Sequence, residues 1–230
     1  MKGNIMKYKA IIFDMDGTIT NTEKIWKAAT EHILSKYLPH ATKEELEALK
    51  LHFKGLALHE TCRIINEAAH QDQKITPEEI IKEKAHYAHM LYKNGVEYIV
   101  HFPEFHAKAS KEFGLKTAIA TNAIGQTLLA TMESLPLADF FGEHMYHIEL
   151  VNKVCKPAPD IYLYAAKQLG VDPSECIAIE DSAHGIAAAK AAGMYCIGIN
   201  TAKDRHTLSQ ADEIVDCYRE IDLPAILNKK

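Results

Sequence analysis

The chain has 230 residues, 47% of them hydrophobic and 25% charged, with a formal net charge of −5 at pH 7. That is enough chain to bury a substantial core, and its mild acidity argues against a nucleic-acid partner, which needs a basic surface. The five cysteines form no Cys-x-x-Cys pair, which argues against a disulfide framework or a cysteine zinc site. With no segment typical of a membrane span or signal peptide, we expect a soluble cytoplasmic protein without a membrane partner.

The first predicted strand covers residues 8–13 (YKAIIF) and leads into an acidic, glycine-containing loop. A short apolar run of this kind is typical of a strand buried on both faces of a parallel sheet. Similar runs occur at residues 116–120, 176–179, 195–199 and, more weakly, 213–215. Helical patterns alternate with them at residues 103–113, 125–134, 160–169 and 185–192. The alternation predicts an α/β fold with a doubly wound parallel-sheet (Rossmann-like) core.

Between residues 21 and 94 the apolar residues recur at helical spacing and strand-like runs are absent. Thr42 and Glu45 have the spacing of a capping box, and Thr76-Pro77 indicates a second helix start with proline in the first turn. We therefore expect residues 1–20 and 95–230 to form an α/β catalytic core, interrupted by a helical cap at residues 21–94.

Two aspartates directly follow the first predicted strand, in the segment Asp14-Met15-Asp16-Gly17-Thr18. Ligands of open α/β sheets bind beyond the carboxyl ends of the strands, so both carboxylates lie where a site is expected. Asp14 can attack phosphorus as a nucleophile, and Asp16 can act as general acid and base. Oxygen ligands combined with a substrate phosphate suit Mg²⁺. For this segment alone, a polar strand-to-turn junction is the alternative.

Glu180 and Asp181 form a second acidic pair, at the end of the strand predicted at residues 176–179. Together with the first pair they would complete a metal site. The alternative is an ordinary helix N-terminus, where acidic residues and serine are favoured by capping and by the helix dipole. Two acidic pairs at strand ends of one sheet favour the metal site.

Two further segments carry groups that bind phosphate. Thr121 and Asn122 follow the strand at residues 116–120, where a hydroxyl and the N–H groups of the next helix suit a phosphate oxygen; a simple N-cap is the alternative. Lys156 begins a Lys-Pro-Ala-Pro segment, whose prolines stiffen the loop, and lysine acts as a point charge towards phosphate or carboxylate. Lys153 is a competing candidate that lacks the proline frame.

In this order, the four segments resemble the motifs of the haloacid dehalogenase superfamily. They are Asp-x-Asp-Gly-Thr, Thr-Asn, Lys-Pro-x-Pro-Asp and Glu-Asp-Ser-x-x-Gly, and they span roughly residues 8–200. The helical insert is similar to the small cap of that family. The subgroup that the chain resembles contains β-phosphoglucomutase and phosphoglycolate phosphatase-like enzymes.

The resemblance implies a role for each acidic residue. Asp14 would be the nucleophile and a Mg²⁺ ligand. Asp16 would be the general acid and base and would bind Mg²⁺ through its backbone carbonyl. Asp181 would be a metal ligand, with Glu180 beside it, directly or through water.

The same resemblance implies that Thr121 and Asn122 bind the transferred phosphoryl group and that Lys156 neutralises the charge around it. Dehalogenation fits poorly, because the dehalogenating members do without the second aspartate and without Mg²⁺. The expected activity is that of a Mg²⁺-dependent phosphatase, acting on a small phosphorylated metabolite through an aspartyl-phosphate intermediate.

Two departures bear on the alternative of a phosphosugar mutase. Trp26 stands where the β-phosphoglucomutase pattern has a histidine, and the arginine that grips a second phosphate would fall near Leu58, after Lys54-Gly55. Without that arginine, hydrolysis of the aspartyl phosphate is favoured. A non-catalytic binding protein on the same fold is a third hypothesis. The sequence does not identify the substrate, and a monomer is expected.

Overall fold

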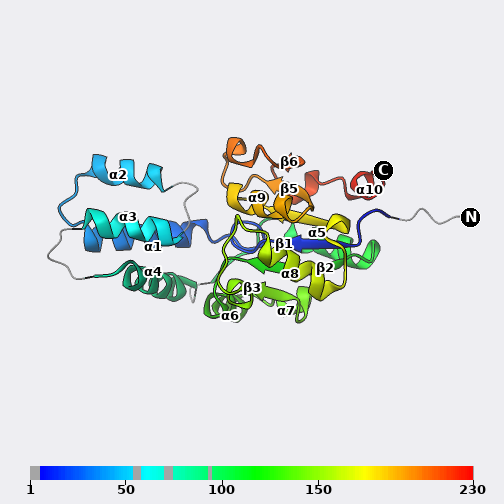
Figure 1. Ribbon diagram of the computed structural model, residues 1–230, viewed down its shortest axis with the longest axis horizontal. Helices are drawn as coiled ribbons and strands as arrows, with labels where there is room; N and C mark the ends of the chain where they lie inside the picture. The colour runs from blue at the N-terminus through cyan, green and yellow to red at the C-terminus, as the bar shows by residue number, and fades with distance from the viewer. Residues whose placement is uncertain (1–5, 54–57, 70–74, 93–94, 230) are drawn as a thin grey trace, which may run out of the picture. The chain divides into compact units, whose positions relative to one another are not determined.

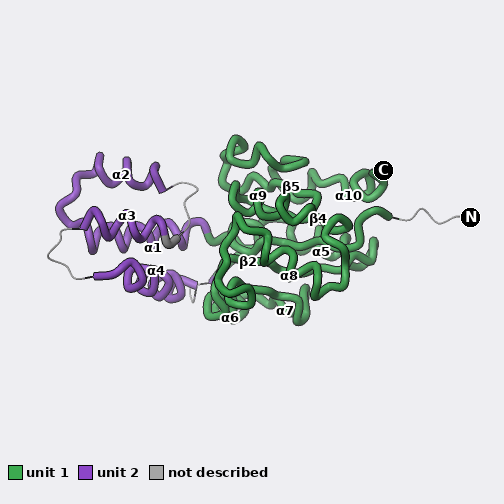
Figure 2. Tube along the Cα trace, in the orientation of Figure 1, with its two compact units in different colours: residues 1–22, 96–230 green, residues 23–95 purple. Residues whose placement is uncertain are grey.

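The computed structural model describes residues 6–53, 58–69, 75–92 and 95–229. It divides into two compact units (Figure 2), a core unit of Met1–Thr22 and Val96–Lys230 and a helical unit of Glu23–Gly95. Among the described residues, no helix is both long and apolar enough to cross a membrane.

The core unit contains a six-stranded parallel sheet in the order β3-β2-β1-β4-β5-β6 (Figure 1). The α/β prediction is thus confirmed, and the five predicted strands all belong to this sheet. Edge strand β3 was not predicted, since its three residues, Met-Tyr-His, lack an apolar run. The strands are β1 (Ala10–Phe13), β2 (Lys116–Thr121), β3 (Met145–His147), β4 (Cys176–Glu180), β5 (Tyr195–Ile199) and β6 (Glu213–Val215).

Helices cover both faces of the sheet. On one face, α8 (Asp160–Leu169) and α9 (Ala183–Ala191) bury alanines and isoleucines against the alternate residues Ala10 and Ile12 of β1. On the other face, Phe13 packs against the aromatic rings of α5 (Phe102–Ala107) and α7 (Ala138–Phe141). Because side chains alternate along β1, this strand contributes to two separate apolar cores, one on each face of the sheet.

The other elements of the core unit connect these layers. The helix predicted at residues 103–113 begins as α5 and continues as a π-helical turn. The connecting elements of the core unit are η1 (Lys108–Glu112), α6 (Gly125–Ser134), η2 (Ile148–Val151), η3 (Pro173–Glu175), η4 (Arg205–Leu208), η5 (Tyr218–Glu220) and α10 (Leu223–Leu227).

The helical unit consists of α1 (Glu23–Tyr37), α2 (Lys43–His52), α3 (Leu58–Ala68) and α4 (Pro77–Tyr92). Its apolar cluster includes Ile33, Ile65 and Ile80, one each from α1, α3 and α4. Both predicted helix starts are confirmed: Thr42 and Glu45 form a reciprocal capping box, and Thr76 exchanges the same pair of hydrogen bonds with Glu79 ahead of α4.

The register of the central strands brings the chemistry-bearing segments together. Phe13, the last residue of β1, is paired with Ile119 of β2 and with Ile179 of β4. The next residues, Asp14 and Glu180, therefore lie level with each other at the carboxyl end of the sheet, one position before Thr121, the last residue of β2. All strands are parallel, so these side chains share the carboxyl edge, where open α/β sheets bind ligands.

Candidate active site

Three carboxylates converge at this edge of the core unit. Asp14, Glu180 and Asp181 each offer an oxygen within 4.8 Å of the oxygens of the other two. Glu180 is fully buried and Asp14 is 8% exposed, whereas Asp181 is half-buried. Buried carboxylates this close to one another repel strongly unless cations are nearby.

Lys156 supplies a cation from within the protein. Its Nζ atom donates to Asp14 Oδ1 and to Glu180 Oε1, each at 2.6 Å, and to the backbone oxygen of Ala120 at 2.9 Å. Lys156 is itself 4% exposed, and its backbone N–H donates to Asn122 Oδ1 at 3.0 Å. The competing candidate, Lys153, is exposed, so the proline-framed lysine is the one that enters the site.

Glu180 is held by hydrogen bonds at both carboxylate oxygens. Oε1 accepts from Lys156 and from the Tyr162 hydroxyl at 2.8 Å. Oε2 accepts from the Ser182 hydroxyl at 3.1 Å. Gly185, in the first turn of α9, leaves room for the carboxyl group, since a Cβ atom there would overlap with it. These contacts orient Glu180 towards Lys156 rather than towards solvent.

The loop after β1 is braced from distant parts of the core unit. Gly17 has a φ of +83° and lies against Asp181, leaving no space for a side chain. Thr18 donates to Asp181 Oδ1 at 3.3 Å, and Tyr218 donates to the backbone oxygen of Thr18 at 2.9 Å. Thr201 donates to the Gly17 oxygen at 2.8 Å. These hydrogen bonds hold the loop after β1 in a fixed position beside Asp181.

The remaining predicted site residues, Asp16, Thr121 and Asn122, lie at or just after the carboxyl ends of β1 and β2. Asp16 follows Asp14 by two positions, and its side chain accepts from the Thr22 hydroxyl at 2.8 Å. It does not belong to the three-carboxylate group found among the described residues. Thr121 is 2% exposed, and its hydroxyl accepts from the backbone N–H of Ala123 at 3.0 Å. Asn122 is exposed and uses its side chain to hold the Lys156 segment.

The electrostatics are those of one cation shared among several acids. Burial raises the pKa of Asp14 well above its usual value, Lys156 opposes the rise, and Glu180 and Asp181 add to it. Burial and the neighbouring Glu180 raise the pKa of Asp181 to about 8. Burial disfavours the charge of Lys156, but Asp14 and Glu180 outweigh it and raise the lysine pKa above its usual value. Perturbations of this size mark a candidate functional site.

The donor set suits a hard divalent cation. All three converging groups are carboxylates, and oxygen is the ligand type that Mg²⁺ prefers. Burial and the neighbouring carboxylates raise the pKa values of Asp14 and Asp181, and a bound divalent cation would favour their ionised forms. The residues present therefore fit Mg²⁺.

Comparison with known proteins identifies the family. The model of the haloacid dehalogenase-like hydrolases matches residues 11–199, which include all four motif segments. The chain belongs to the haloacid dehalogenase-like hydrolase family. The expected superfamily is thus confirmed, and so is the enzyme class, since relatives of this chain are named as phosphatases.

Three similar proteins illustrate the match to this hydrolase family. Protein CbbY of Rhodobacter capsulatus is 34% identical over 84% of this chain and 85% of its own. A phosphorylated carbohydrates phosphatase of Thermotoga maritima is 27% identical over 93% of this chain and 99% of its own. The structure of a CbbY variant from Rhodobacter sphaeroides, in complex with xylulose 1,5-bisphosphate, has a TM-score of 0.77 and 26% identity, covering 96% of this chain and 100% of that one.

Sequence reasoning missed three side chains that support the site, namely Tyr162, Thr201 and Tyr218, and it assigned no role to Thr18 within the first motif. Tyr162 had a usable signal, because it lies in the first turns of the helix that directly follows the lysine motif. Thr201 and Tyr218 had none, since they come from the ends of distant elements and meet the acidic loop only in the folded chain.

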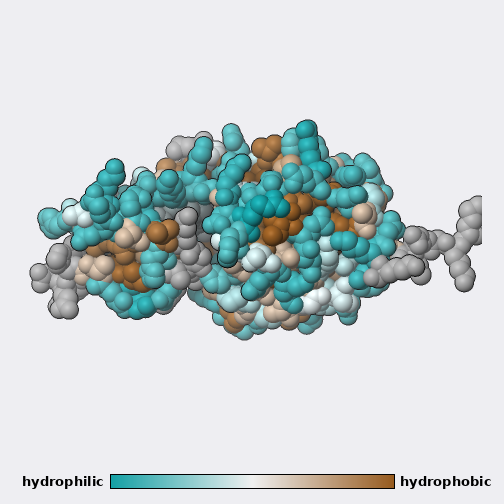
Figure 3. Space-filling model, turned by 90° about the horizontal axis from the view of Figure 1, so that it is seen from above, coloured by the Kyte–Doolittle hydropathy of each residue, from teal (hydrophilic) through white to brown (hydrophobic). Residues whose placement is uncertain are grey.

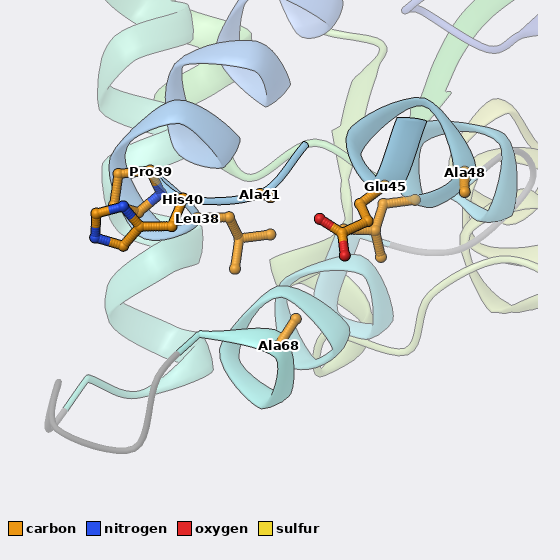
Figure 4. Close-up of a pocket in the computed structure, with 8 residues that line it drawn as sticks. Leu38, Pro39, His40, Ala41, Glu45, Ala48 and Ala68 are labelled. Carbon is orange, nitrogen blue, oxygen red and sulfur yellow. The ribbon is translucent and has the colours of Figure 1, made fainter. Parts of the chain in front are cut away.

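The helical unit contains a cavity of about 480 Å³ between the α1–α2 connection, α2 and α3 (Figure 4). Its lining is mostly apolar, and Glu45, its acidic member, is engaged in the capping box with Thr42. The cavity holds none of the predicted site residues. The segment 54–57, where the mutase-type lysine and glycine fall, lies outside the described residues, as does the side chain of Leu58. The cavity is lined by Leu38, Pro39, His40, Ala41, Glu45, Ala48, Leu49 and Ala68.

Proposed function

We propose that this chain is a Mg²⁺-dependent phosphatase that hydrolyses a small phosphorylated metabolite through a phosphoryl group carried on Asp14. The observation that carries the proposal is the contact of Lys156 Nζ with Asp14 Oδ1 at 2.6 Å, inside a cluster of three carboxylates. A lysine at this distance orients one carboxylate oxygen and leaves the other for attack on phosphorus.

In the first step, an oxygen of Asp14 attacks the phosphorus of the ester, and the bond to the leaving alkoxide breaks. Asp16 donates a proton to the oxygen of the leaving group, so a neutral alcohol departs. Lys156 offsets the negative charge that gathers on the phosphoryl oxygens, and the hydroxyl of Thr121 contributes a hydrogen bond to one of them. In the second step Asp16 takes a proton from water, which attacks the aspartyl phosphate, releases inorganic phosphate and restores Asp14.

The metal site of the proposal consists of Asp14, Asp181 and the backbone carbonyl of Asp16. Mg²⁺ held there supplies charge neutralisation for the phosphoryl group and for the ionised nucleophile. Glu180, also predicted as a metal ligand, has both oxygens engaged by protein donors. We therefore assign Glu180 to the orientation of Lys156, and any contact of Glu180 with the metal would be through water.

Phosphate release from a panel of phosphorylated metabolites and an aryl phosphate tests the proposal. We expect release that requires Mg²⁺, is abolished by a chelator and is lost in Asp14→Asn. Asp139→Asn, an equal change at an exposed position of α7, should keep the activity within about twofold. Acid quenching during turnover, followed by mass spectrometry, should find a phosphoryl group on Asp14. Release that survives in Asp14→Asn would refute the assignment.

Relatives suggest a phosphorylated sugar as the substrate class. The Thermotoga relative is named a phosphorylated carbohydrates phosphatase, and an Escherichia coli relative, 28% identical, a fructose-1-phosphate phosphatase. Neither name carries over directly, so both sugar phosphates belong in the panel. The helical unit, as the cap, is proposed to select among them. A sugar bisphosphate that is required in catalytic amounts would favour the mutase alternative.

A further inference from the structure

Tyr162 is a fully buried residue of α8 that contacts two of the charged groups of the site. Its hydroxyl donates to Glu180 Oε1 at 2.8 Å and accepts a longer hydrogen bond, of 3.4 Å, from Lys156 Nζ. We propose that Tyr162 is a positioning residue for phosphoryl transfer, which keeps the charge of Lys156 directed at Asp14 by engaging Glu180. The inference rests on the proposed function, because it concerns the rate of that reaction.

The argument begins with a competition between two carboxylates for one ammonium group. Lys156 Nζ is 2.6 Å from Asp14 and equally 2.6 Å from Glu180. Glu180 is the more deeply buried acid, with a side chain 0% exposed against 12% for Asp14. Charge-assisted hydrogen bonds strengthen where water is excluded, so an unassisted Glu180 would draw the lysine away from the nucleophile.

The Tyr162 hydroxyl weakens that competition at the relevant atom. It donates to Oε1 of Glu180, the same oxygen that Lys156 contacts, while Ser182 donates to Oε2. A carboxylate whose oxygens are already engaged by neutral donors attracts a further cation less strongly. Burial and the nearby Glu180 also raise the pKa of Tyr162 well above its usual value, so the hydroxyl keeps its proton and remains a donor.

The ring of Tyr162 has a separate role from its hydroxyl. Lys156 Nζ lies 4.8 Å from the ring centroid, a distance at which the aromatic face attracts a cation. Replacement by phenylalanine keeps this ring and removes only the hydroxyl. The substitution therefore separates the two hydrogen bonds of the hydroxyl, to Glu180 and from Lys156, from packing and from the cation–ring contact.

The chain also offers a matched control. Tyr164 lies on the same helix, and its half-buried ring packs edge-on against Tyr146 at 5.3 Å rather than against the charged cluster. We expect Tyr162→Phe to lower kcat for an aryl phosphate about 10-fold at saturating Mg²⁺, as for the loss of one hydrogen bond to a charged group. Its KM should stay within about twofold, and Tyr164→Phe should leave both constants within about twofold.

A double-variant cycle then separates positioning from a purely structural role. If Tyr162 acts through Lys156, Tyr162→Phe should cause less than a twofold further loss of kcat in a Lys156→Met background. Thermal unfolding under the assay conditions confirms that each variant is folded. An equal loss in both backgrounds, or a loss shared by Tyr164→Phe, would overturn the positioning role.

The remaining outcomes distinguish this inference from the proposed function. A wild-type enzyme that is active and matched by Tyr162→Phe would overturn the role of Tyr162 alone. A wild-type protein that releases no phosphate from any ester would overturn the phosphatase, and the role of Tyr162 with it.

Discussion

Replacement of Lys156 by methionine removes the ammonium group while keeping an unbranched side chain of similar length. The lysine is 3% exposed at its side chain and contacts two acids that are 12% and 0% exposed, Asp14 and Glu180. Its loss leaves both carboxylates buried without that cation. Removing one partner of a buried ion pair costs about 3–5 kcal/mol, so we expect a loss of that size in the free energy of unfolding of the metal-free protein at neutral pH.

The assay compares Lys156→Met with Lys153→Met, which removes the same charge from an exposed position of the same loop. Urea unfolding without metal should place the control within about 0.5 kcal/mol of wild type. Phosphate release should fall at least about 100-fold in Lys156→Met, as when one preorganised group that stabilises transition-state charge is removed, and about twofold at most in the control.

The destabilisation of Lys156→Met should shrink in acid, because Asp14, whose pKa is raised by burial, can then take up a proton and no longer needs a counter-charge. Equal stability and equal activity of the two variants would refute the reasoning. The 2.6 Å contacts of Lys156 with Asp14 and Glu180 would then contribute nothing to the free energy of unfolding or to the rate.

Two further predictions concern the same cluster. Gly185→Ala should displace the Glu180 carboxyl group, because the added Cβ atom would overlap with it. We therefore expect this variant to have a lower kcat and a lower melting temperature. As a control, Ala183→Gly at the exposed start of α9 should leave kcat unchanged. The pKa of Asp181 is raised to about 8 in the fold, so the metal-free protein should lose stability as pH rises from about 4 to 8. Mg²⁺ should therefore raise the melting temperature more at pH 8 than at pH 5.5, and an equal increment at both pH values would contradict this.

The sequence by itself determined the fold class and the family. Apolar runs as short as Ala10–Phe13 indicated buried parallel strands, and the structure has them in one sheet. The boundaries of α6 and α8 agree with their helical periodicity, because apolar spacing and breaker residues are local properties. The motif segments were recognisable for a similar reason, since each is contiguous in the chain.

The tertiary structure decided which groups meet. The sequence favoured Lys156 over Lys153 through its proline frame, but only folding brings Lys156 against Asp14, 142 positions away in the chain. The sequence predicted Glu180 beside the metal, directly or through water, and only the fold shows that its two oxygens also accept hydrogen bonds from Lys156, Tyr162 and Ser182.

These contacts could not be assigned from the sequence alone because they depend on the register of the strands. Pairing of Phe13 with Ile119 and Ile179 sets which residues leave the sheet side by side, and no local pattern encodes that pairing. A carboxylate at a strand end can have the same neighbours in sequence whether it faces solvent, a metal or a buried lysine. The environment provided by the other strands and by α8 selects among these, so the sequence indicated the kind of site and the tertiary structure determined which of its side chains contact one another.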